Sequence, residues 1–540
     1  MRCGNFPKTA RICRKSITFA AEMRRVALSL LLAMCLAARA QRERALFDSL
    51  HYRVEMQATL SNGEHNPLWL SANRYGLSSL KTTNGYLRAA LARPLQHDSL
   101  RRWGIGYALD VAVPIGFTSH FVLQQAYAEV RWLKGVLTVG SKEWPMELKN
   151  PLLSSGSQTL GINARPIPQV RLALADYWTV PYTKKWLALK GHIAYGMQTD
   201  TRWQRDFTRR ESKYVEHALY HSKAAYLRIG PKNITLELGL EMACQFGGTT
   251  YIDNGSIVYN NSSNLKAFVH ALIPGGTDTG EAGPTGVYEN TSGNHVGSWV
   301  GRLRFDYPSW GVAFYFDHYF EDHSSMFLLD YDGYGSGANW NEKERFNFFM
   351  YDLKDNMLGL DLHLKRLPWL EHIVVEYLHT KYQSGPVYHD HSQHVGTHIA
   401  GRDEYYNHSK QTGWQHWGMV MGNPLYLSPL YNDDTGVIAV KNNRFVAWHF
   451  GVSGRPLRGL SYRLLMTNQK GYGTYLSLYP DPRYDFSLMV EAEYRFQPSS
   501  LLRGWVVKAA YGMDHGRLYG NNSGVQLTIA KHGILKTKKR

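Results

Sequence analysis

One stretch of the sequence combines the side chains that bind sugars. Flat aromatic rings pack on the C–H faces of a sugar, while amides, carboxylates and guanidinium groups bond its hydroxyls. We predict a polysaccharide-binding loop over residues 402–423, carried by Arg402, Asp403, Tyr405, Tyr406, Asn407, Trp414, His416, Trp417 and Asn423. The alternative is that the tryptophans only pack the loop or mark a membrane interface, and that Arg402 and Asp403 form an ion pair that orders it.

A second candidate follows the aromatic stretch 312–320. Glu321, Asp322 and His323 come directly after it and add two carboxylates and an imidazole. We include Glu321 and Asp322 in the predicted binding site. The competing interpretation is an ordinary solvated strand end.

Metal binding and catalysis find less support. The run His389-Asp390-His391 with His394 and His398 has imidazoles at short spacing, but no cysteine and no defined ligand motif accompany it. No Gly-x-Ser-x-Gly turn marks a nucleophile, and paired carboxylates such as Glu491 and Glu493 suit a polar barrel lumen. We therefore expect neither a metal site nor a cofactor, and no enzyme.

The N-terminus predicts export. Arg24 and Arg25 precede an apolar run, residues 26–38, that ends in the small-residue triplet Ala38-Arg39-Ala40. This run is shorter than the roughly 20 residues of a membrane-spanning helix, so we expect residues 1–40 to be a cleaved signal peptide. Met23 is an alternative start. A lipid anchor on Cys35 is disfavoured because Met34 precedes it where a small residue is wanted.

Charge and cysteine content narrow the class of protein. The chain carries a formal charge of +17, and its first 40 residues hold eight Lys/Arg and one Glu, so +10 remains beyond them. Without a nucleic-acid-reading motif, anionic lipid headgroups or acidic polysaccharide are the better partners. Cys244 is the only cysteine after residue 40, so no internal disulfide is expected.

A period of two in hydrophobicity runs through the chain and predicts β-strands. In residues 104–113, Ile105, Leu109 and Val113 share one face while Gly104, Asp110 and Ala112 share the other. Residues 234–242, 486–496 and 525–529 repeat the pattern. The second face is small or charged throughout, as in the water-facing side of a strand.

Composition favours a membrane barrel over a soluble sandwich. The chain has 35 Tyr and 15 Trp, which suits aromatic girdles at bilayer interfaces, and about 500 residues pass without a visible linker. We predict an all-β fold over residues 41–540: a large antiparallel transmembrane barrel of roughly 16–18 strands. Residues 62–80 are expected to form a small helical plug, and residues 274–295, 321–343 and 383–436 long loops.

Several phrases of the chain, in order, resemble the Wzi-type capsule-assembly proteins of the Bacteroidetes. In the first half they are Asn66-Pro67-Leu68-Trp69, Gln125-Ala126-Tyr127-Ala128-Glu129, Ala164-Arg165-Pro166-Ile167-Pro168-Gln169 and Tyr226-Leu227-Arg228-Ile229-Gly230. In the second half they are Gly293-Asn294-His295-Val296-Gly297-Ser298, Gly401-Arg402-Asp403-Glu404-Tyr405-Tyr406-Asn407, Gly413-Trp414-Gln415-His416-Trp417-Gly418, Gly422-Asn423-Pro424-Leu425 and Tyr472-Gly473-Thr474-Tyr475. The resemblance covers most of the chain after residue 40.

The resemblance implies an outer-membrane barrel of roughly eighteen strands, plugged at its periplasmic side. It further implies a protein that binds capsular or exopolysaccharide and holds it at the cell surface without turnover. Outer-membrane lipid, lipopolysaccharide and the polysaccharide export machinery are the other expected partners, and nucleic acid is not. The alternatives are a porin or substrate channel and an outer-membrane hydrolase of glycan or lipid.

Overall fold

The computed structural model describes residues 50–98, 102–274, 293–321, 355–388 and 399–535, with a few further positions between 321 and 355. Within them, eighteen antiparallel strands close into a barrel in which each strand pairs with the next along the chain. The last strand pairs with the first. The predicted fold class is confirmed, and the closed sheet leaves no unpaired edge.

The eighteen barrel strands follow one another along the chain. The first nine are β1 (Leu50–Asn62), β2 (Thr83–Arg93), β3 (Trp103–Ile115), β4 (Val122–Trp132), β5 (Gly135–Ser141), β6 (Gln169–Thr179), β7 (Leu187–Met197), β9 (Leu219–Ile229) and β10 (Ile234–Phe246). The others are β13 (Asn294–Asp306), β14 (Gly311–Glu321), β15 (Asn356–His363), β16 (His372–His379), β21 (Phe445–Leu457), β22 (Leu460–Gly473), β23 (Leu478–Arg495), β24 (Trp505–Gly516) and β25 (Asn522–Leu535).

The connections contain the remaining elements. In the described part of the chain, the helices are α2 (Leu68–Ser71), α3 (Thr201–Phe207) and α4 (Leu265–Leu272), and the short 3-10 turns are η2 (Leu95–Asp98), η3 (Gly337–Asn339), η4 (Pro368–Leu370) and η5 (Pro429–Asn432). Short strands are β8 (Tyr214–Glu216), β11 (Thr249–Ile252), β12 (Ile257–Asn260), β17 (Ser384–Tyr388), β18 (Ile399–Arg402), β19 (Gln415–His416) and β20 (Met419–Val420). Among the described residues, no helix is long and apolar enough to cross a membrane.

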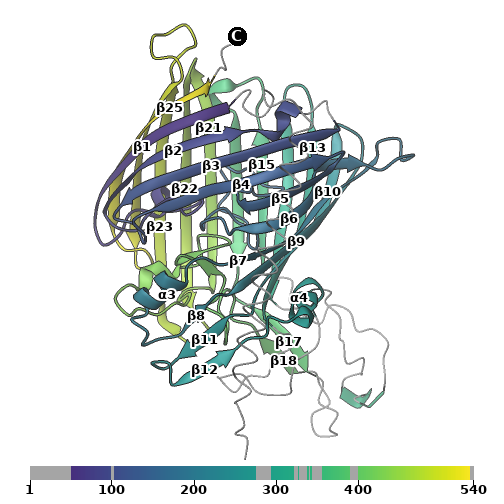
Figure 1. The fold of residues 1–540 in the computed structure, drawn as a ribbon, viewed down its shortest axis with the longest axis vertical. Helices are drawn as coiled ribbons and strands as arrows, with labels where there is room; N and C mark the ends of the chain where they lie inside the picture. The colour runs from purple at the N-terminus through teal and green to yellow at the C-terminus, as the bar shows by residue number, and fades with distance from the viewer. Residues whose placement is uncertain are drawn as a thin grey trace, which may run out of the picture. The chain divides into compact units, whose positions relative to one another are not determined.

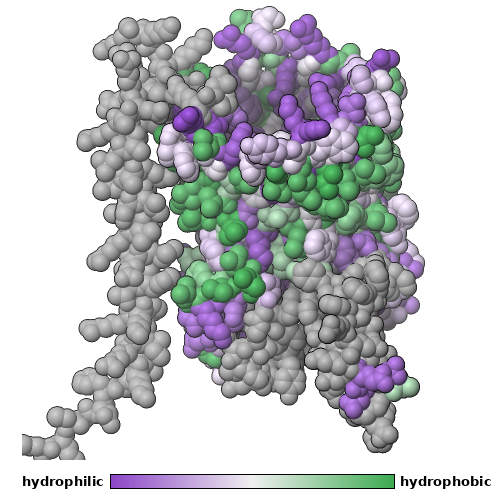
Figure 2. All heavy atoms as spheres, turned by 90° about the vertical axis from the view of Figure 1, so that its right-hand side faces the viewer, coloured by the Kyte–Doolittle hydropathy of each residue, from purple (hydrophilic) through white to green (hydrophobic). Residues whose placement is uncertain are grey.

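The alternation of the strands sorts side chains between the outer wall and the lumen. On β3, Leu109 is 54% exposed on the outer wall, whereas the neighbouring Asp110 points inward and is 2% exposed. In the lumen, Asp110 accepts hydrogen bonds from Arg88 on β2 at 2.8 and 2.5 Å. Figure 2 shows the result on one side of the barrel, an apolar belt between more polar ends.

The connections at the two ends of the barrel differ in length. At one end, which also carries the termini of the barrel, every connection has nine residues or fewer. At the other end, the connections include residues 142–168, 198–218, 247–293, 322–355 and 380–444 (Figure 1). We call these the short-turn end and the long-connection end.

Three segments from the long-connection end fill much of the lumen. Residues 63–82, 142–168 and 403–444, here called the plug, supply Trp69, Leu153 and Trp414 to one buried core with wall residues such as Tyr319 and Phe445.

The helix expected over residues 62–80 is a single turn, α2, which is fully buried. The plug was expected on the periplasmic side, whereas the connection that carries α2 belongs to the long-connection end. Most of the plug is irregular chain, and its backbone groups bond other plug segments and wall carboxylates in place of helix bonds. The Tyr75 N–H donates to the Ile162 carbonyl at 2.7 Å, and the Leu68 N–H donates to Asp514 on β24 at 3.0 Å.

Candidate functional site

The structure buries most of the side chains predicted to bind polysaccharide. Tyr405, Tyr406, Trp414, His416 and Asn423 are each at most 2% exposed and belong to the plug. The rings of Tyr406 and Tyr426 stack at 3.9 Å, and the Trp414 indole N–H donates to the Thr159 carbonyl at 3.0 Å. Asn423 donates to the Gly156 carbonyl at 3.0 Å. In this conformation these side chains join plug segments 142–168 and 403–444.

Glu321 fastens the plug to the wall. Its carboxylate, at the end of β14, accepts hydrogen bonds from the Tyr406 backbone N–H at 2.6 Å and the Tyr319 hydroxyl at 2.7 Å. Asn407 exchanges two hydrogen bonds with the backbone of Val440, at 3.0 and 2.9 Å. Both residues therefore order the chain on which the other predicted residues lie.

The remaining predicted residues are only partly described. Asp403 is half-buried, and its backbone N–H donates to the Gln383 carbonyl at 2.9 Å. Asp322, His323, the side chain of Arg402 and the histidine run 389–398 lie outside the described residues. Among the residues that are described, no group of three His, Cys, Asp or Glu side chains is placed to hold a metal ion.

Trp417 differs from the other predicted residues. It is half-buried, the Arg165 guanidinium lies 4.4 Å above its ring, and its indole N–H donates to the Thr199 hydroxyl at 3.2 Å. Its backbone has φ +55°, the left-handed region that costs a non-glycine residue about 1–2 kcal/mol. Strain of this kind is often retained where a side chain has a function.

The Arg165 side chain that lies against this ring is held by several partners. Its guanidinium donates to the hydroxyls of Ser119 and Thr118 at 2.8 and 2.9 Å, and its carbonyl accepts from His416 Nδ1 at 2.9 Å. Burial lowers the pKa of Arg165 to about 10, partly offset by the Asp200 carboxylate. The guanidinium nevertheless stays charged at neutral pH, so Trp417 and Arg165 present an aromatic ring beside a cation.

A surface that was not predicted from the sequence lies at the long-connection end, and we call it the tyrosine–cation rim. It consists of Lys381, Arg444, Lys470, Arg483, Tyr472, Tyr475, Tyr479 and Tyr484. The Arg444 and Arg483 guanidinium groups each lie 3.9 Å from a ring centroid, that of Tyr475 and Tyr479 respectively. The Lys381 ammonium lies 4.3 Å from the Tyr472 centroid.

The rim has the chemistry of an anion-binding surface. Among the described residues, none of its four cations forms a salt bridge with a carboxylate. The tyrosine faces hold the cations by cation–π attraction, which leaves N–H donors for carboxylates or phosphates. Two cations and four tyrosines within residues 470–484 carry a signal for this surface in the sequence.

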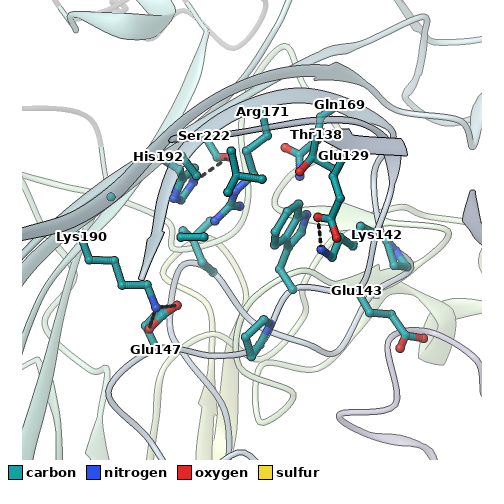
Figure 3. A pocket seen from close by; sticks show the side chains of 18 of the residues that line it. Glu129, Thr138, Lys142, Glu143, Glu147, Gln169, Arg171, Lys190, His192 and Ser222 are labelled. Carbon is teal, nitrogen blue, oxygen red and sulfur yellow. Dashed lines mark hydrogen bonds and ion pairs between the residues drawn. The ribbon is translucent and has the colours of Figure 1, made fainter. Parts of the chain in front are cut away.

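A second polar space lies inside the barrel. A cavity of about 530 Å³ separates the wall strands β4–β7 and β9 from plug segment 142–168 (Figure 3). It extends from Leu133 and Lys134 in a short turn to Trp414 and Met421 in the plug. Its volume is in the range of small-molecule sites.

Charged side chains line this cavity in pairs. The Lys142 ammonium bonds Glu129 at 2.5 Å, and the Lys190 ammonium bonds Glu147 at 2.7 Å (Figure 3). Arg171 stacks on the Trp144 ring at 3.9 Å. The lining can therefore bond polar solutes, although most of its charges already have partners.

Buried carboxylates on the wall hold the inner side of the same plug segment. Lys149 and Asp317 form an ion pair at 2.8 Å with both side chains essentially inaccessible. Glu376 accepts from the Ser154 hydroxyl at 2.6 Å and from the Ser155 backbone N–H at 2.8 Å. These bonds fix segment 142–168 across the lumen.

Comparisons with known proteins find similarity in structure. No protein-family model and no curated protein matches the chain. Wzi of Escherichia coli, described as an outer-membrane carbohydrate-binding β-barrel involved in group 1 capsule assembly, aligns with a TM-score of 0.53 and 14% identity, over 93% of this chain and 88% of Wzi. Pseudomonas aeruginosa OprD aligns with a TM-score of 0.43 and 9% identity, over 91% and 96% of the two chains. At 14% identity the likeness to Wzi extends to the fold alone, a large antiparallel barrel.

Proposed function

We propose that this chain is an outer-membrane protein that binds a surface polysaccharide and holds it at the cell, without turning it over. The observation that carries the proposal is the combination of an apolar outer belt with a lumen crossed by a bonded plug. A closed barrel with an apolar outer wall suits a membrane, and a plugged lumen favours binding over free passage. The similarity of fold to a carbohydrate-binding barrel supports this choice.

We place the binding surface at the long-connection end, which in such barrels is usually extracellular. The tyrosine–cation rim supplies donors for acidic groups, and Trp417 with Arg165 supplies a ring beside a cation. The chemistry of these residues is that of an acidic polysaccharide site. The other predicted residues of 402–423 would act by ordering the plug beneath this surface.

The test is binding of the host's own surface polysaccharide to the purified full-length protein in detergent. Lys470→Gln with Arg483→Gln should weaken binding by about tenfold or more, equivalent to 1.4 kcal/mol, and added salt should weaken the wild type. Arg455→Gln is the matched control, because Arg455 is 64% exposed and bonds Glu371 at the short-turn end. Unchanged binding in the double variant would remove the rim from the site.

A parallel arm uses lipopolysaccharide from a strain that lacks the polysaccharide. The proposal expects much weaker binding there, since a lipid phosphate offers only a few anionic groups where a polymer offers many. Equal binding to both would reassign the rim to lipid headgroups.

A second candidate function is a substrate channel, and the polar cavity at the short-turn end favours it. A channel requires a continuous aqueous path past Trp414 and Met421. Planar-bilayer recordings separate the two functions, because the binding protein should pass little current. Stable conductance blocked by a specific solute would favour the channel.

A further inference from the structure

Helix α4 lies on the outer wall of the barrel rather than in the lumen. On β10, Glu241 and Ala243 point inward, so the alternate residues Cys244 and Phe246 point outward. Ala267 and Ala271 of α4 share a buried cluster with Cys244 and Phe246. In Figure 1 the helix accordingly appears beside the lower part of β9 and β10.

Side chains of the outer wall hold the helix there. The Tyr195 hydroxyl on β7 donates to the Phe268 carbonyl at 2.8 Å. The Lys223 ammonium on β9 donates to the carbonyls of Ala271 and Leu272 at 3.0 and 2.5 Å, where a helix C-terminus favours a cation. The Asn264 side chain caps the other end by accepting from the Ala267 N–H. The helix thereby gives an outward-facing lysine its hydrogen-bond acceptors.

The opposite side of α4 carries a stripe of apolar side chains. Leu265, Val269 and Ile273 are 82%, 48% and 65% exposed and stand four residues apart, on one face of the helix and its first following residue. On β7, Ile193 and Met197 flank the Tyr195 contact and are themselves exposed parts of the apolar belt. The stripe thus continues the belt sideways at the long-connection end.

We propose that α4 is an interfacial helix whose stripe inserts among the acyl chains of the outer leaflet. The inference rests on the outer-membrane location proposed above. In water, exposed apolar side chains lose the favourable free energy that burial would give them. A helix lying in the membrane interface instead buries its apolar face among lipids. Continuity with the belt identifies lipid as the occupant, because residues on the same wall at the same level already face it.

The test measures the depth of labels on the protein in lipid vesicles. Cys244 is fully buried and is the one cysteine after residue 40, so the chain from residue 41 on, without Cys3, Cys13 and Cys35, serves as the background for single cysteines carrying an environment-sensitive fluorophore. Val269→Cys reports on the stripe, Ile193→Cys on the belt and Ser256→Cys on an exposed turn after β11. Quenchers are a nitroxide on the upper acyl chain of phosphatidylcholine and aqueous iodide.

We expect the Val269 label to be quenched by the lipid nitroxide about as strongly as the Ile193 label and shielded from iodide, with the Ser256 label behaving oppositely. A Val269 label open to iodide, with the Ile193 label still quenched by lipid, would overturn the role of α4 and leave the outer-membrane location standing. An Ile193 label that lipid does not quench would instead overturn the location. Shielding of Val269 that disappears on diluting the protein in lipid would assign the stripe to a second copy of the chain.

A variant without new labels checks the same inference. The triple variant Leu265→Ser, Val269→Ser and Ile273→Ser should leave the barrel folded. The check is that the unboiled protein migrates faster than the boiled protein on a denaturing gel. In vesicles, trypsin should cleave after the exposed Lys266 several-fold faster than in the wild type, because the helix no longer inserts. An unchanged cleavage rate would contradict insertion of the stripe.

Discussion

Trp414 and Trp417 lie three residues apart but serve different parts of the molecule. Trp414 is 1% exposed and stacks with Tyr220 of the wall at 6.0 Å, whereas Trp417 is half-buried beside Arg165. Their residue types alone suggested one binding surface for both, since an aromatic ring suits a sugar face and a protein core equally well. Burial separates the two roles.

We expect Trp414→Ala to destabilise the protein by about 3–5 kcal/mol, the usual cost of truncating a buried tryptophan. Trp417→Ala should cost about 1 kcal/mol or less, because the Trp417 side chain is only half-buried and loses fewer contacts. Urea unfolding in detergent measures both. If Trp417→Ala also weakens polysaccharide binding while Trp414→Ala only lowers stability, the assignment holds; the reverse pattern would contradict it.

His416 makes the plug sensitive to acid. Its Nε2 accepts the Thr199 N–H at 3.1 Å while Nδ1 faces the Arg165 carbonyl, so the ring is bound in its neutral form. Burial lowers the pKa of His416; the Asp200 carboxylate and the Arg165 carbonyl oppose this shift, and the Arg165 charge adds to it. The unfolded chain then binds more protons than the folded one below about pH 6.5. The free energy of unfolding therefore decreases as the pH is lowered through that range.

The measurement is the free energy of unfolding between pH 7 and pH 5 for the wild type and His416→Gln. The variant should be less stable at pH 7 and should lose less of its free energy of unfolding on acidification. The difference in the free energy of unfolding between wild type and variant should therefore narrow as the pH falls. A constant difference would mean that His416 does not couple the plug to pH.

At the scale of elements, plug segment 142–168 depends on carboxylates of the wall. Glu376 is fully buried and accepts from Ser154, Ser155 and the Tyr315 hydroxyl. Glu376→Gln leaves a buried donor without its acceptor, which costs about 1–3 kcal/mol. Limited proteolysis should show faster cleavage within 142–168. Glu371→Gln is the control, since its bond to the exposed Arg455 is a surface pair worth about 0–1 kcal/mol.

The outer belt gives a second prediction about elements. Leu109→Arg places a charge on the middle of β3, where lipid should surround it, and should destabilise the folded protein by about 2–4 kcal/mol in vesicles. Leu476 lies in the turn between β22 and β23 and is 86% exposed, so Leu476→Arg should change stability little. Equal effects at the two positions would argue against a lipid-facing belt.

The strands were predictable from the sequence, whereas only residues 62–80 of the plug were. The inward and outward faces of β3, β10 and β23 match the alternation, because a period of two fixes the side of each residue once one face is apolar. Residues 383–436 were expected to be a long loop, whereas most of 403–444 lies buried in the lumen. A polar, glycine-rich composition fits an exposed loop and a lumen plug equally well, because water and a polar lumen accept the same side chains.

Close backbone approaches explain part of the plug's composition. The Gly161 N–H donates to the Met421 carbonyl at 3.1 Å, and a Cβ at Gly161 would lie 2.6 Å from the Gly422 carbonyl oxygen. Segments 142–168 and 403–444 therefore pass where neither tolerates a side chain. Such pairing of two glycines 261 positions apart leaves no local pattern in the sequence.

For the whole molecule, the proposed function gives the apolar wall, the bonded plug and the cationic rim one common role. The apolar wall suits a membrane, the plug fills much of the lumen, and we propose that the rim and Trp417 bind the polysaccharide at the long-connection end. Retention at the surface requires all three. It predicts a change in where the polysaccharide is found rather than in how much is made.

The most direct measurement is therefore the partition of surface polysaccharide between cells and medium in a strain that lacks this protein. The account predicts that total polysaccharide stays constant while most of it moves to the medium. The wild-type chain should restore the cell-bound fraction, and Lys470→Gln with Arg483→Gln should not. An unchanged partition together with loss of uptake of a small solute would contradict the account and favour a channel.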